Sequence, residues 1–493
     1  MTTPAAPTGA TIGHAEIRII LVGVVLAMLL GALDQTIVVT ALPTIGRELG
    51  NVESLSWVVT AYLVTATAVT PLYGKLSDIH GRRVMLMAAI SIFLVGSIAC
   101  ALAPSITWLI AARAFQGLGG GALISLGQTI IGDVVAPRER GRYQAYFAAV
   151  FTTASIAGPV LGGFFAEYLH WSFIFWINLP LGIAAYLMTS RVLKLLPRHD
   201  HPHSLDLIGA GLMLIATISL LMALTWGGST YPWASVEIIG LFAASVAGWG
   251  LFGARLASAE EPFIPLSVLG NSVVRNGVGA MFFAVGSLVG LSVFMPLYFE
   301  AVLGLSAAAS GVALIALMGG AVTGATISGR IMVRYTRYKW TAVAGLALAT
   351  VFTTALAFWP ASLSFVGVEI LLAVIGMGLG TIFPIATTAV QNAVPLRQLG
   401  TTTGVLNFFR SLGGAILVPV FSAIFLTSVA AGGDLASVQT VILEGSRNGV
   451  DFAHVLTGVF AAAAVALLLA FFFQLAMKEL PLRSQLDVVA ESG

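Results

Sequence analysis

The stretch Gly74-Lys75-Leu76-Ser77-Asp78-Ile79-His80-Gly81-Arg82-Arg83 decides the fold, because it lies between two long apolar runs at 55–73 and 84–103. Each run has the length that an α-helix needs to cross the hydrocarbon core of a bilayer, about 20 residues. The stretch between them is short, polar and basic. We therefore interpret this part of the chain as two membrane spans joined by a charged connection.

The composition extends this interpretation to the whole chain. Of its 493 residues, 58% are hydrophobic and only 9% are charged, whereas a soluble domain carries roughly a quarter charged residues. Runs long enough to span lie near 17–41, 55–73, 84–103, 106–131, 143–166, 173–192, 206–226, 235–256, 273–299, 308–332, 339–358, 363–390, 401–426 and 452–476. They are too long and too evenly apolar for barrel strands, which alternate over about 10 residues. We predict an all-α integral membrane protein with fourteen spans.

The basic residues predict the orientation. Of the 23 Lys and Arg residues, all but four fall on one face when the connections are numbered alternately. Arg47 and Arg447 fall on the other face, and Arg113 and Arg410 lie inside spans. Basic connections mark the cytoplasmic side, so we expect both termini in the cytoplasm and the first apolar run retained as a helix.

The chain also repeats itself. Residues 134–141 read VVAPRERG and residues 393–400 read AVPLRQLG, and each is followed by a span containing Leu-Gly-Gly, at 161–163 and at 412–414. Repeated halves with the substrate site between them are the usual construction of secondary transporters. We divide the chain into a cytoplasmic tail 1–16, a six-helix half 17–195, two inserted helices with linkers 196–260, a second six-helix half 261–478 and a cytoplasmic tail 479–493.

Four motifs carry a family resemblance. The stretch 74–83 matches G-x-L-[small]-D-x-x-G-R-[RK], and Leu33–Pro43 resembles L-D-x-T-I-V-N-V-A-L-P with Val39 in place of Asn. Arg113–Gly121 resembles R-x-x-Q-G-x-G-[GA], and Gly158–Gly163 resembles G-P-x-x-G-G. With the span count, these motifs identify the chain as similar to the fourteen-span drug:proton antiporters of the major facilitator superfamily. The resemblance implies the major facilitator fold of two six-helix halves plus two inserted helices.

The first motif has two interpretations. In the family interpretation its residues form a gating latch, in which glycines let helix ends approach, Asp78 caps a neighbouring helix and the arginines pair across the cytoplasmic seam. The alternative is a basic loop that only sets topology. The latch residues are Gly74, Asp78, Gly81, Arg82 and Arg83.

The antiporter motif of the fifth span also has two interpretations. Its glycines give a small-residue face where helices pack closely, and its proline bends the helix, so packing alone and a dynamic hinge both fit. The residues concerned are Gly158, Pro159, Gly162 and Gly163.

Charged side chains inside a bilayer cost at least ~2.5–3.5 kcal/mol and need a functional or pairing reason. Asp34 and Arg113 each lie about seven residues, roughly 10 Å, below the outer end of their predicted spans. We expect them within pairing reach on the central cavity, with Asp34 as a proton or cation acceptor; the alternative is a static ion pair. Glu369 is a further proton-coupling candidate, or else an interfacial residue. Asp133 is an inner proton relay or a helix-end partner of Arg138 and Arg140.

We predict a substrate site that combines carboxylates with rings suited to lipophilic cations, although packing explains any single ring as well. Its candidate residues are Asp34, Glu369, Trp57, Tyr62, Phe294, Tyr298 and Glu300.

The resemblance predicts a proton-coupled exporter of lipophilic, often cationic, drugs and dyes, working by alternating access. A dedicated exporter of one metabolite, lipid or siderophore fits the same scaffold, and a membrane sensor or scaffold is the rival from another class. No G-x-x-x-x-G-K-[ST] phosphate loop is present, which argues against an ATP-driven pump. We expect no enzymatic activity, metal, cofactor or nucleic-acid partner. We expect a monomer in a bacterial inner membrane, energised by the proton gradient and conferring antibiotic resistance.

Overall fold

The computed structural model describes residues 14–50, 54–192, 205–228, 230–360, 363–430 and 451–483, and the regular elements in these ranges are helices. Fourteen helical segments in the described ranges are long and apolar enough to cross a membrane, which confirms the predicted number. These apolar segments are helical because backbone N–H and C=O groups in lipid must be hydrogen-bonded within their own segment.

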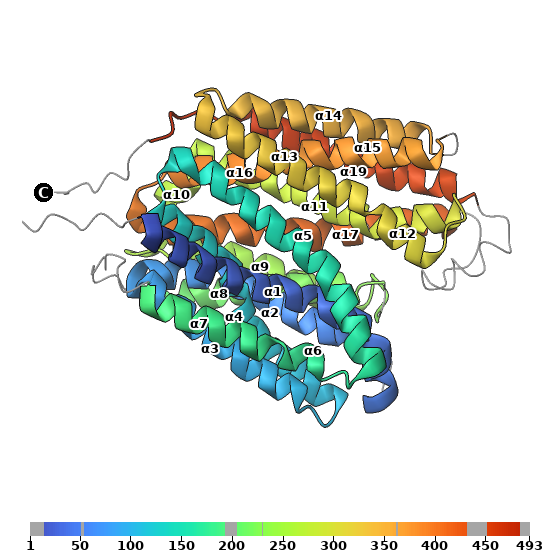
Figure 1. Cartoon of the computed structure of the whole chain (residues 1–493), viewed down its shortest axis with the longest axis horizontal. Helices are drawn as coiled ribbons and strands as arrows, with labels where there is room; N and C mark the ends of the chain where they lie inside the picture. Colours follow the sequence, from blue (N-terminus) through green and yellow to red (C-terminus); the bar gives the residue numbers. More distant parts are fainter. Residues whose placement is uncertain are drawn as a thin grey trace, which may run out of the picture.

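The first six spans form an N-terminal half, which occupies the lower part of Figure 1. Its buried residues form two adjoining apolar cores, around Val24, Phe93 and Leu123 and around Ile37 and Phe175. The helices are α1 (His14–Leu49), α2 (Leu55–His80), α3 (Arg82–Ala101), α4 (Ile106–Val134), α5 (Pro137–Tyr168), α6 (Phe173–Trp176) and α7 (Asn178–Val192).

The last six spans form a C-terminal half around a larger apolar core that includes Phe299, Leu372 and Phe460. In this half the twelfth span is divided at Thr381 into two helices. The elements are α10 (Leu266–Gly270), α11 (Ser272–Ala301), α12 (Ala307–Ala313), α13 (Ile315–Arg334), α14 (Lys339–Phe358), α15 (Phe365–Gly380), α16 (Ile382–Asn392), the 3₁₀ turn η3 (Leu396–Gln398), α17 (Leu399–Ala430) and α19 (Phe452–Ala476).

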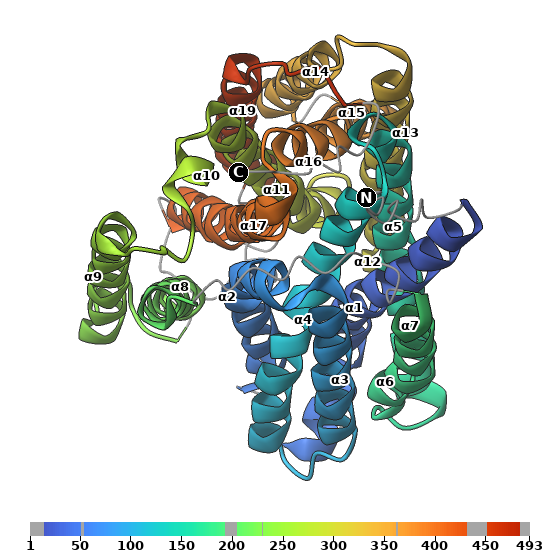
Figure 2. The same cartoon turned by 90° about the vertical axis from the view of Figure 1, so that its left-hand side faces the viewer.

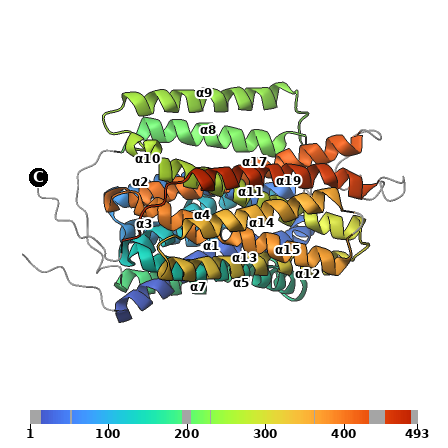
Figure 3. The ribbon, with the colours of Figure 1, turned by 90° about the horizontal axis from the view of Figure 1, so that it is seen from above.

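The two inserted helices, α8 (Leu207–Trp226) and α9 (Val236–Ser258), lie beside the halves rather than between them (Figures 2 and 3). α8 packs against α2 of one half and α17 of the other. Val64, Leu221, Phe408 and Leu412 form the apolar contact at this junction.

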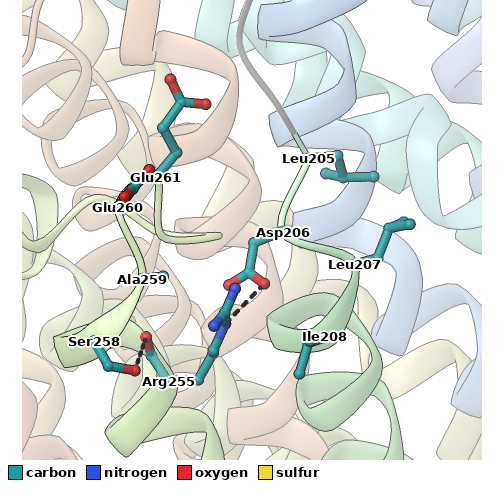
Figure 4. Close-up of a pocket in the computed structure, with 9 residues that line it drawn as sticks. All are labelled: Leu205, Asp206, Leu207, Ile208, Arg255, Ser258, Ala259, Glu260 and Glu261. Atoms are coloured by element: carbon teal, nitrogen blue, oxygen red, sulfur yellow. Dashed lines mark hydrogen bonds and ion pairs between the residues drawn. The ribbon is translucent and has the colours of Figure 1, made fainter.

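An ion pair ties the inserted helices together at one end. Asp206 Oδ1 accepts a hydrogen bond from the backbone N–H of Gly209 at 3.0 Å, which caps α8, and another from Arg255 Nε of α9 at 3.1 Å. Figure 4 shows this pair in a surface pocket, with Glu260 and Glu261 set apart from it. The pocket is lined by residues at the start of α8, at the end of α9 and just after α9.

The two halves meet most closely at the end of the bundle where α2, α4 and α13 finish and α5 and α17 begin, on the left in Figure 1. We call this the basic end, and we call the surface along which the halves meet there the seam. In Figure 1, α5 crosses the bundle from α13 at the basic end to the N-terminal half at the opposite end.

Several helix ends differ from their predicted positions. α1 continues past Ala41 and through Pro43 to Leu49, and α2 continues to His80. Much of the predicted loop 74–83 is therefore helical, because partners in the protein satisfy its polar groups. Only Gly81, with φ +88°, separates α2 from α3. Most of the predicted tails, residues 1–13 and 484–493, and the linker 196–204 lie outside the described residues.

Candidate functional site

Asp34 and Arg113 form an ion pair inside the N-terminal half. Arg113 Nη1 on α4 donates to Asp34 Oδ2 on α1 at 2.6 Å, and the side chains are 1% and 0% exposed. The other carboxylate oxygen, Oδ1, accepts from Gln116 Nε2 and from Asn178 Nδ2, each at 3.0 Å. The predicted pairing is thus confirmed, and both oxygens of the carboxylate are occupied by donors.

Arg113 is held on several sides. Its Nη1 also donates to Gln116 Oε1 at 2.7 Å, and its Nε donates to the Val58 carbonyl at 3.0 Å. The guanidinium lies over the Tyr62 ring, 4.2 Å from the centroid. A buried cation with an acid, two further acceptors and an aromatic face is well compensated, and Tyr62 is the one predicted aromatic that joins this site.

An outer layer fixes the amide that reaches Asp34. Asn178, at the start of α7, also donates to Ser97 Oγ at 2.9 Å, and that hydroxyl donates to the Phe175 carbonyl at 2.9 Å. The network therefore joins α1, α2, α3, α4, α6 and α7, all within the N-terminal half. The expected position on a central cavity is wrong for this conformation, because the pair is enclosed by its own half.

The end of α1 lies further from Asp34 than predicted. Because α1 continues to Leu49, Asp34 lies 15 residues from that end, roughly 22 Å at about 1.5 Å per residue. Arg113 lies seven residues from the start of α4 at Ile106, as expected. The two side chains still meet, because α1 extends past the beginning of α4.

Asp78 joins the two halves at the basic end. Its Oδ1 accepts from the Gly400 N–H at 2.9 Å, and its Oδ2 accepts from the Thr401 N–H at 2.7 Å and from the Thr401 hydroxyl at 2.6 Å. Gly400 and Thr401 lie in the first turn of α17, whose free N–H groups favour an anion. The predicted capping of a neighbouring helix by Asp78 is confirmed.

Arg82 holds this carboxylate from within the N-terminal half. It donates to Asp78 Oδ1 at 2.5 Å, to Ser77 Oγ at 2.8 Å and to Asp133 Oδ2 at 2.8 Å. The prediction that the arginines pair across the seam is therefore wrong for Arg82, whose partners all lie on its own side. Arg83 makes no ion pair with any residue that the structure describes.

Asp133 is therefore a partner of Arg82. Arg140, which we expected beside it, donates to the carbonyls of Gly132 and Val135 at the end of α4 instead. Burial lowers the pKa of Arg140 to about 10, so its guanidinium stays charged at neutral pH.

Glycines bring the helices together at the seam. A Cβ placed on Gly74 would lie 2.5 Å from the Gly400 carbonyl oxygen, and one on Gly141 would lie 2.8 Å from the Gly329 carbonyl oxygen. The first pair joins α2 to α17 and the second joins α5 to α13. Because the halves are repeats, these are equivalent crossings on opposite sides of the protein.

The two crossings are fastened by different chemistry. Counting from Gly329 as from Gly74, Val333 stands where Asp78 would. Arg138 Nε donates to the Val333 carbonyl at 3.1 Å, so a neutral backbone acceptor replaces the carboxylate. The two sides of the seam are therefore unequal.

Buried amides cross the seam between these two points. Asn407 Nδ2 on α17 donates to Gln128 Oε1 on α4 at 2.8 Å, and Gln391 Nε2 on α16 donates to the Gln128 carbonyl at 3.3 Å. Both amides also donate within their own half, to the Thr403 carbonyl and hydroxyl, so contact between the halves supplies part of their hydrogen bonding. They stabilise the closed basic end.

The antiporter motif on α5 packs against α1. Cβ atoms at Gly158 and Gly162 would lie 2.0 and 2.2 Å from the hydroxyl oxygens of Thr36 and Thr40. Thr36 also donates to the Ala154 carbonyl of α5 at 2.8 Å. A Cβ on Gly163 would meet no described atom within 4 Å, so this glycine takes no part in the crossing. Pro159 lies inside the continuous helix.

Other predicted residues lie apart from this site. Glu369 is half-buried near the start of α15, with its Oε1 unpaired among described residues. Tyr298 is buried against Phe460 and donates to the Pro360 carbonyl at 2.5 Å. Phe294 packs on Phe425. The structure does not bring these C-terminal-half residues to the Asp34 network.

Two predicted residues lie near the opposite end. Trp57 packs edge-to-face on Trp226 of α8, with ring centroids 5.2 Å apart, so it contacts the inserted pair. Glu300 is exposed next to the end of α11.

Sequence reasoning missed the amides of the site, namely Gln116, Asn178, Gln128, Gln391 and Asn407. The signal in the sequence was a polar amide side chain within an apolar run, because such a group is costly inside a membrane unless it is hydrogen-bonded. Within the described residues no group of three His, Cys, Asp or Glu side chains is placed to hold a metal ion.

Two helical halves that meet at a glycine-rich seam, with a buried ion pair inside one of them, are the construction of a secondary transporter. The chain belongs to the Major Facilitator Superfamily, whose sequence model matches residues 24–418. This confirms the family expected from the motifs, and the protein is a transporter rather than an enzyme.

The chain is similar to the multidrug transporter protein MdtP of Bacillus subtilis, with 32% identity over 467 residues that cover 94% of this chain and 85% of that protein. Multidrug resistance protein 3 of Bacillus subtilis is 32% identical over 414 residues, covering 84% and 80%. Among solved structures, the human organic anion transporter MFSD10 superposes with a TM-score of 0.64 at 18% identity, covering 93% of this chain and 99% of that one. That likeness concerns the fold.

Proposed function

We propose that this protein is a proton-coupled exporter of lipophilic drugs and dyes, often cationic, that works by alternating access in a bacterial inner membrane. The observation that carries the proposal is the fully buried Asp34 carboxylate, which is paired with Arg113 between the apolar cores of the N-terminal half. A carboxylate retained at this depth against its insertion cost needs a role. The similarity to multidrug transporters supports the exporter.

The direction follows from the charges. With the basic end in the cytoplasm, both termini lie there too, and the closed seam shuts the protein on its cytoplasmic side. Asp78 on the first turn of α17 and the Gln128–Asn407 bond hold it closed. Opening the seam breaks these contacts and gives the inward-facing state.

Coupling would proceed by competition for Asp34. In the conformation described, Arg113, Gln116 and Asn178 occupy the carboxylate. Movement of α1 against α4 separates the pair and frees Asp34 for a proton. A cationic drug near the freed carboxylate favours its ionised form and expels that proton. Glu369 is the second acid in this scheme, while Asp133 acts with Arg82 at the latch. The proton gradient supplies the energy, and one chain suffices without a cofactor.

The test is transport by purified protein in liposomes with an imposed proton gradient. We expect wild-type protein to move a quaternary ammonium dye in a gradient-dependent way, and Asp34→Asn to lose that dependence. Glu237→Gln, which neutralises an exposed carboxylate on α9, is the matched control and should transport normally.

Two results would redirect the proposal. Full gradient-driven transport by Asp34→Asn would remove Asp34 from the coupling step. A folded wild-type protein that moves no dye would favour an exporter dedicated to one endogenous compound.

A further inference from the structure

Arg410 is an intramembrane cation that the scheme above does not use. It lies on α17, 14 residues inside a span that runs from Leu396 to Val429. At about 1.5 Å per residue this is roughly 20 Å from the basic end, which is well within the hydrocarbon region. A guanidinium at this depth is costly unless something compensates its charge.

The protein itself compensates Arg410 only weakly. Among the described residues it has no ion pair and no hydrogen bond; its one contact of note is with the Phe151 ring of α5, 5.7 Å from the guanidinium carbon. Arg113, by contrast, has a carboxylate at 2.6 Å. Arg410 thus retains a full charge and five unused N–H donors.

The contact with Phe151 shows which way Arg410 points. Thr403, Asn407 and Arg410 follow one face of α17 at helical spacing, and Asn407 on this face reaches Gln128 across the seam. Arg410 lies one turn further toward the opposite end and extends toward α5 of the other half. It therefore faces the junction of the halves rather than lipid.

The protein does not fully enclose the Arg410 side chain. Arg410 is half-buried, whereas Asn407 one turn below it is buried. α5 packs mainly on α1 and α13, and α17 mainly on α2 and α11, so the guanidinium lies between two helices that are each engaged elsewhere.

No carboxylate among the described residues forms an ion pair with Arg410. Asp34 is used by Arg113 within the N-terminal half, and Asp78 and Asp133 are used by Arg82 at the basic end. The positive charge of Arg410 therefore has no described acidic partner and lies next to the Phe151 ring where α17 faces α5.

We propose that Arg410 binds the anionic group of the substrate, so that the transport site accepts lipophilic aromatic compounds bearing a carboxylate, including zwitterions. A guanidinium recognises carboxylate through paired N–H donors, and Phe151 supplies a ring for the aromatic part. The inference rests on the proposed exporter function and adds a substrate class to it.

The test compares two probes that differ in one charge, a rhodamine with a free carboxylate and its methyl ester. Equilibrium binding is measured by fluorescence polarisation with the full-length protein in phosphatidylcholine nanodiscs, so that no anionic lipid competes and no proton gradient is involved. We expect the acid to bind wild-type protein about tenfold more tightly than the ester.

Arg410→Gln should lower the affinity for the acid about ten- to hundredfold, the range expected for a lost charge-assisted hydrogen bond. It should leave ester binding unchanged, which also shows that the variant is folded. Arg410→Lys should keep part of the preference, because it retains the charge but not the planar fork. Arg330→Gln, which removes an exposed arginine at the basic end, is the matched control.

Equal binding of acid and ester by wild-type protein would overturn the inference. So would a loss in Arg410→Gln that is the same for both probes, since that is the result for an arginine that only packs on Phe151. Failure of proton coupling in the liposome assay would overturn the exporter mechanism and leave this binding ratio intact, so the two failures are distinguishable.

Discussion

Asp78 and Thr401 are joined across the seam by two hydrogen bonds to one carboxylate oxygen, 2.7 Å from the backbone N–H and 2.6 Å from the hydroxyl. Because Asp78 is held on its own side by Arg82, its carboxylate is positioned before the halves meet. A charged acceptor at a helix N-terminus is worth about 0.5–2 kcal/mol. This contact is therefore large enough to bias the equilibrium between the closed and open seam.

Asp78→Asn should shift this equilibrium toward an open basic end. A loss of about 1–2 kcal/mol changes a two-state ratio roughly five- to thirtyfold. Spin labels are attached at Glu139→Cys on α5 and Arg337→Cys after α13, in a Cys100→Ala background. In double electron–electron resonance, Asp78→Asn should show a larger population of long distances between the labels than wild type does. His80→Gln, an exposed change in the same turn, should leave the distances as in wild type. An unchanged distribution in Asp78→Asn would mean that the contact does not act as a latch.

The buried ion pair predicts a cycle of variants. Asp34→Asn and Arg113→Gln should each destabilise the protein strongly, by about 3–5 kcal/mol, because each leaves one charge buried without its partner. The double variant should recover most of this loss. Thermal unfolding in one detergent measures all three.

Transport by the double variant separates structure from coupling. If Asp34 carries the proton, gradient-driven dye movement stays absent even though stability returns. A double variant that regains both would reveal a static pair that only orients α1 and α4.

The glycines of α5 should differ in their tolerance of alanine. Gly158→Ala and Gly162→Ala place a methyl group 2.0 and 2.2 Å from threonine hydroxyls on α1, so the crossing must separate and transport should fall at least tenfold. Gly163→Ala points into open space and should transport as wild type. Uptake into inverted vesicles, normalised to folded protein, measures the three together, and equal losses in all three variants would contradict the packing interpretation.

Tyr298→Phe tests whether this ring contacts substrate or only packs. Its hydroxyl donates to the Pro360 carbonyl in the interior of the C-terminal half, so we expect a loss of about 0.5–1.5 kcal/mol in stability and an unchanged KM for transported dyes. A raised KM without a change in melting temperature would return Tyr298 to the substrate site.

The number of spans could be predicted from sequence, because the cost of exposing backbone to lipid acts on each segment separately. The pairing of Asp34 with Arg113 could be predicted too, because an ion pair lowers the free-energy cost of placing two opposite charges inside the bilayer. The partner of Arg82 could not. Asp133 and a carboxylate across the seam are both compatible with the motif, and the choice depends on how the helices cross.

The faces of the helices were also beyond the sequence. Phe294 and Tyr298 lie in a helix that is apolar on all sides, so no polar stripe indicates which side faces the core. The predicted end of α1 was also wrong. Pro43 favours a helix end near that position, but α1 continues through it to Leu49. Gly163 looked equivalent to Gly162 until the rotation of α5 was known.

The inserted helices make the two flanks of the protein unlike. α8 covers the junction of α2 and α17 with the apolar contact of Val64, Leu221, Phe408 and Leu412, while the junction of α5 and α13 has no such helix over it among the described residues. A compound dissolved in the surrounding leaflet therefore meets α8 on one flank, and meets α5 and α13 directly on the other. If lipophilic molecules enter from the membrane when the seam opens, we expect them to enter between α5 and α13. This is the crossing held by the bond from Arg138 to the Val333 carbonyl rather than by a carboxylate.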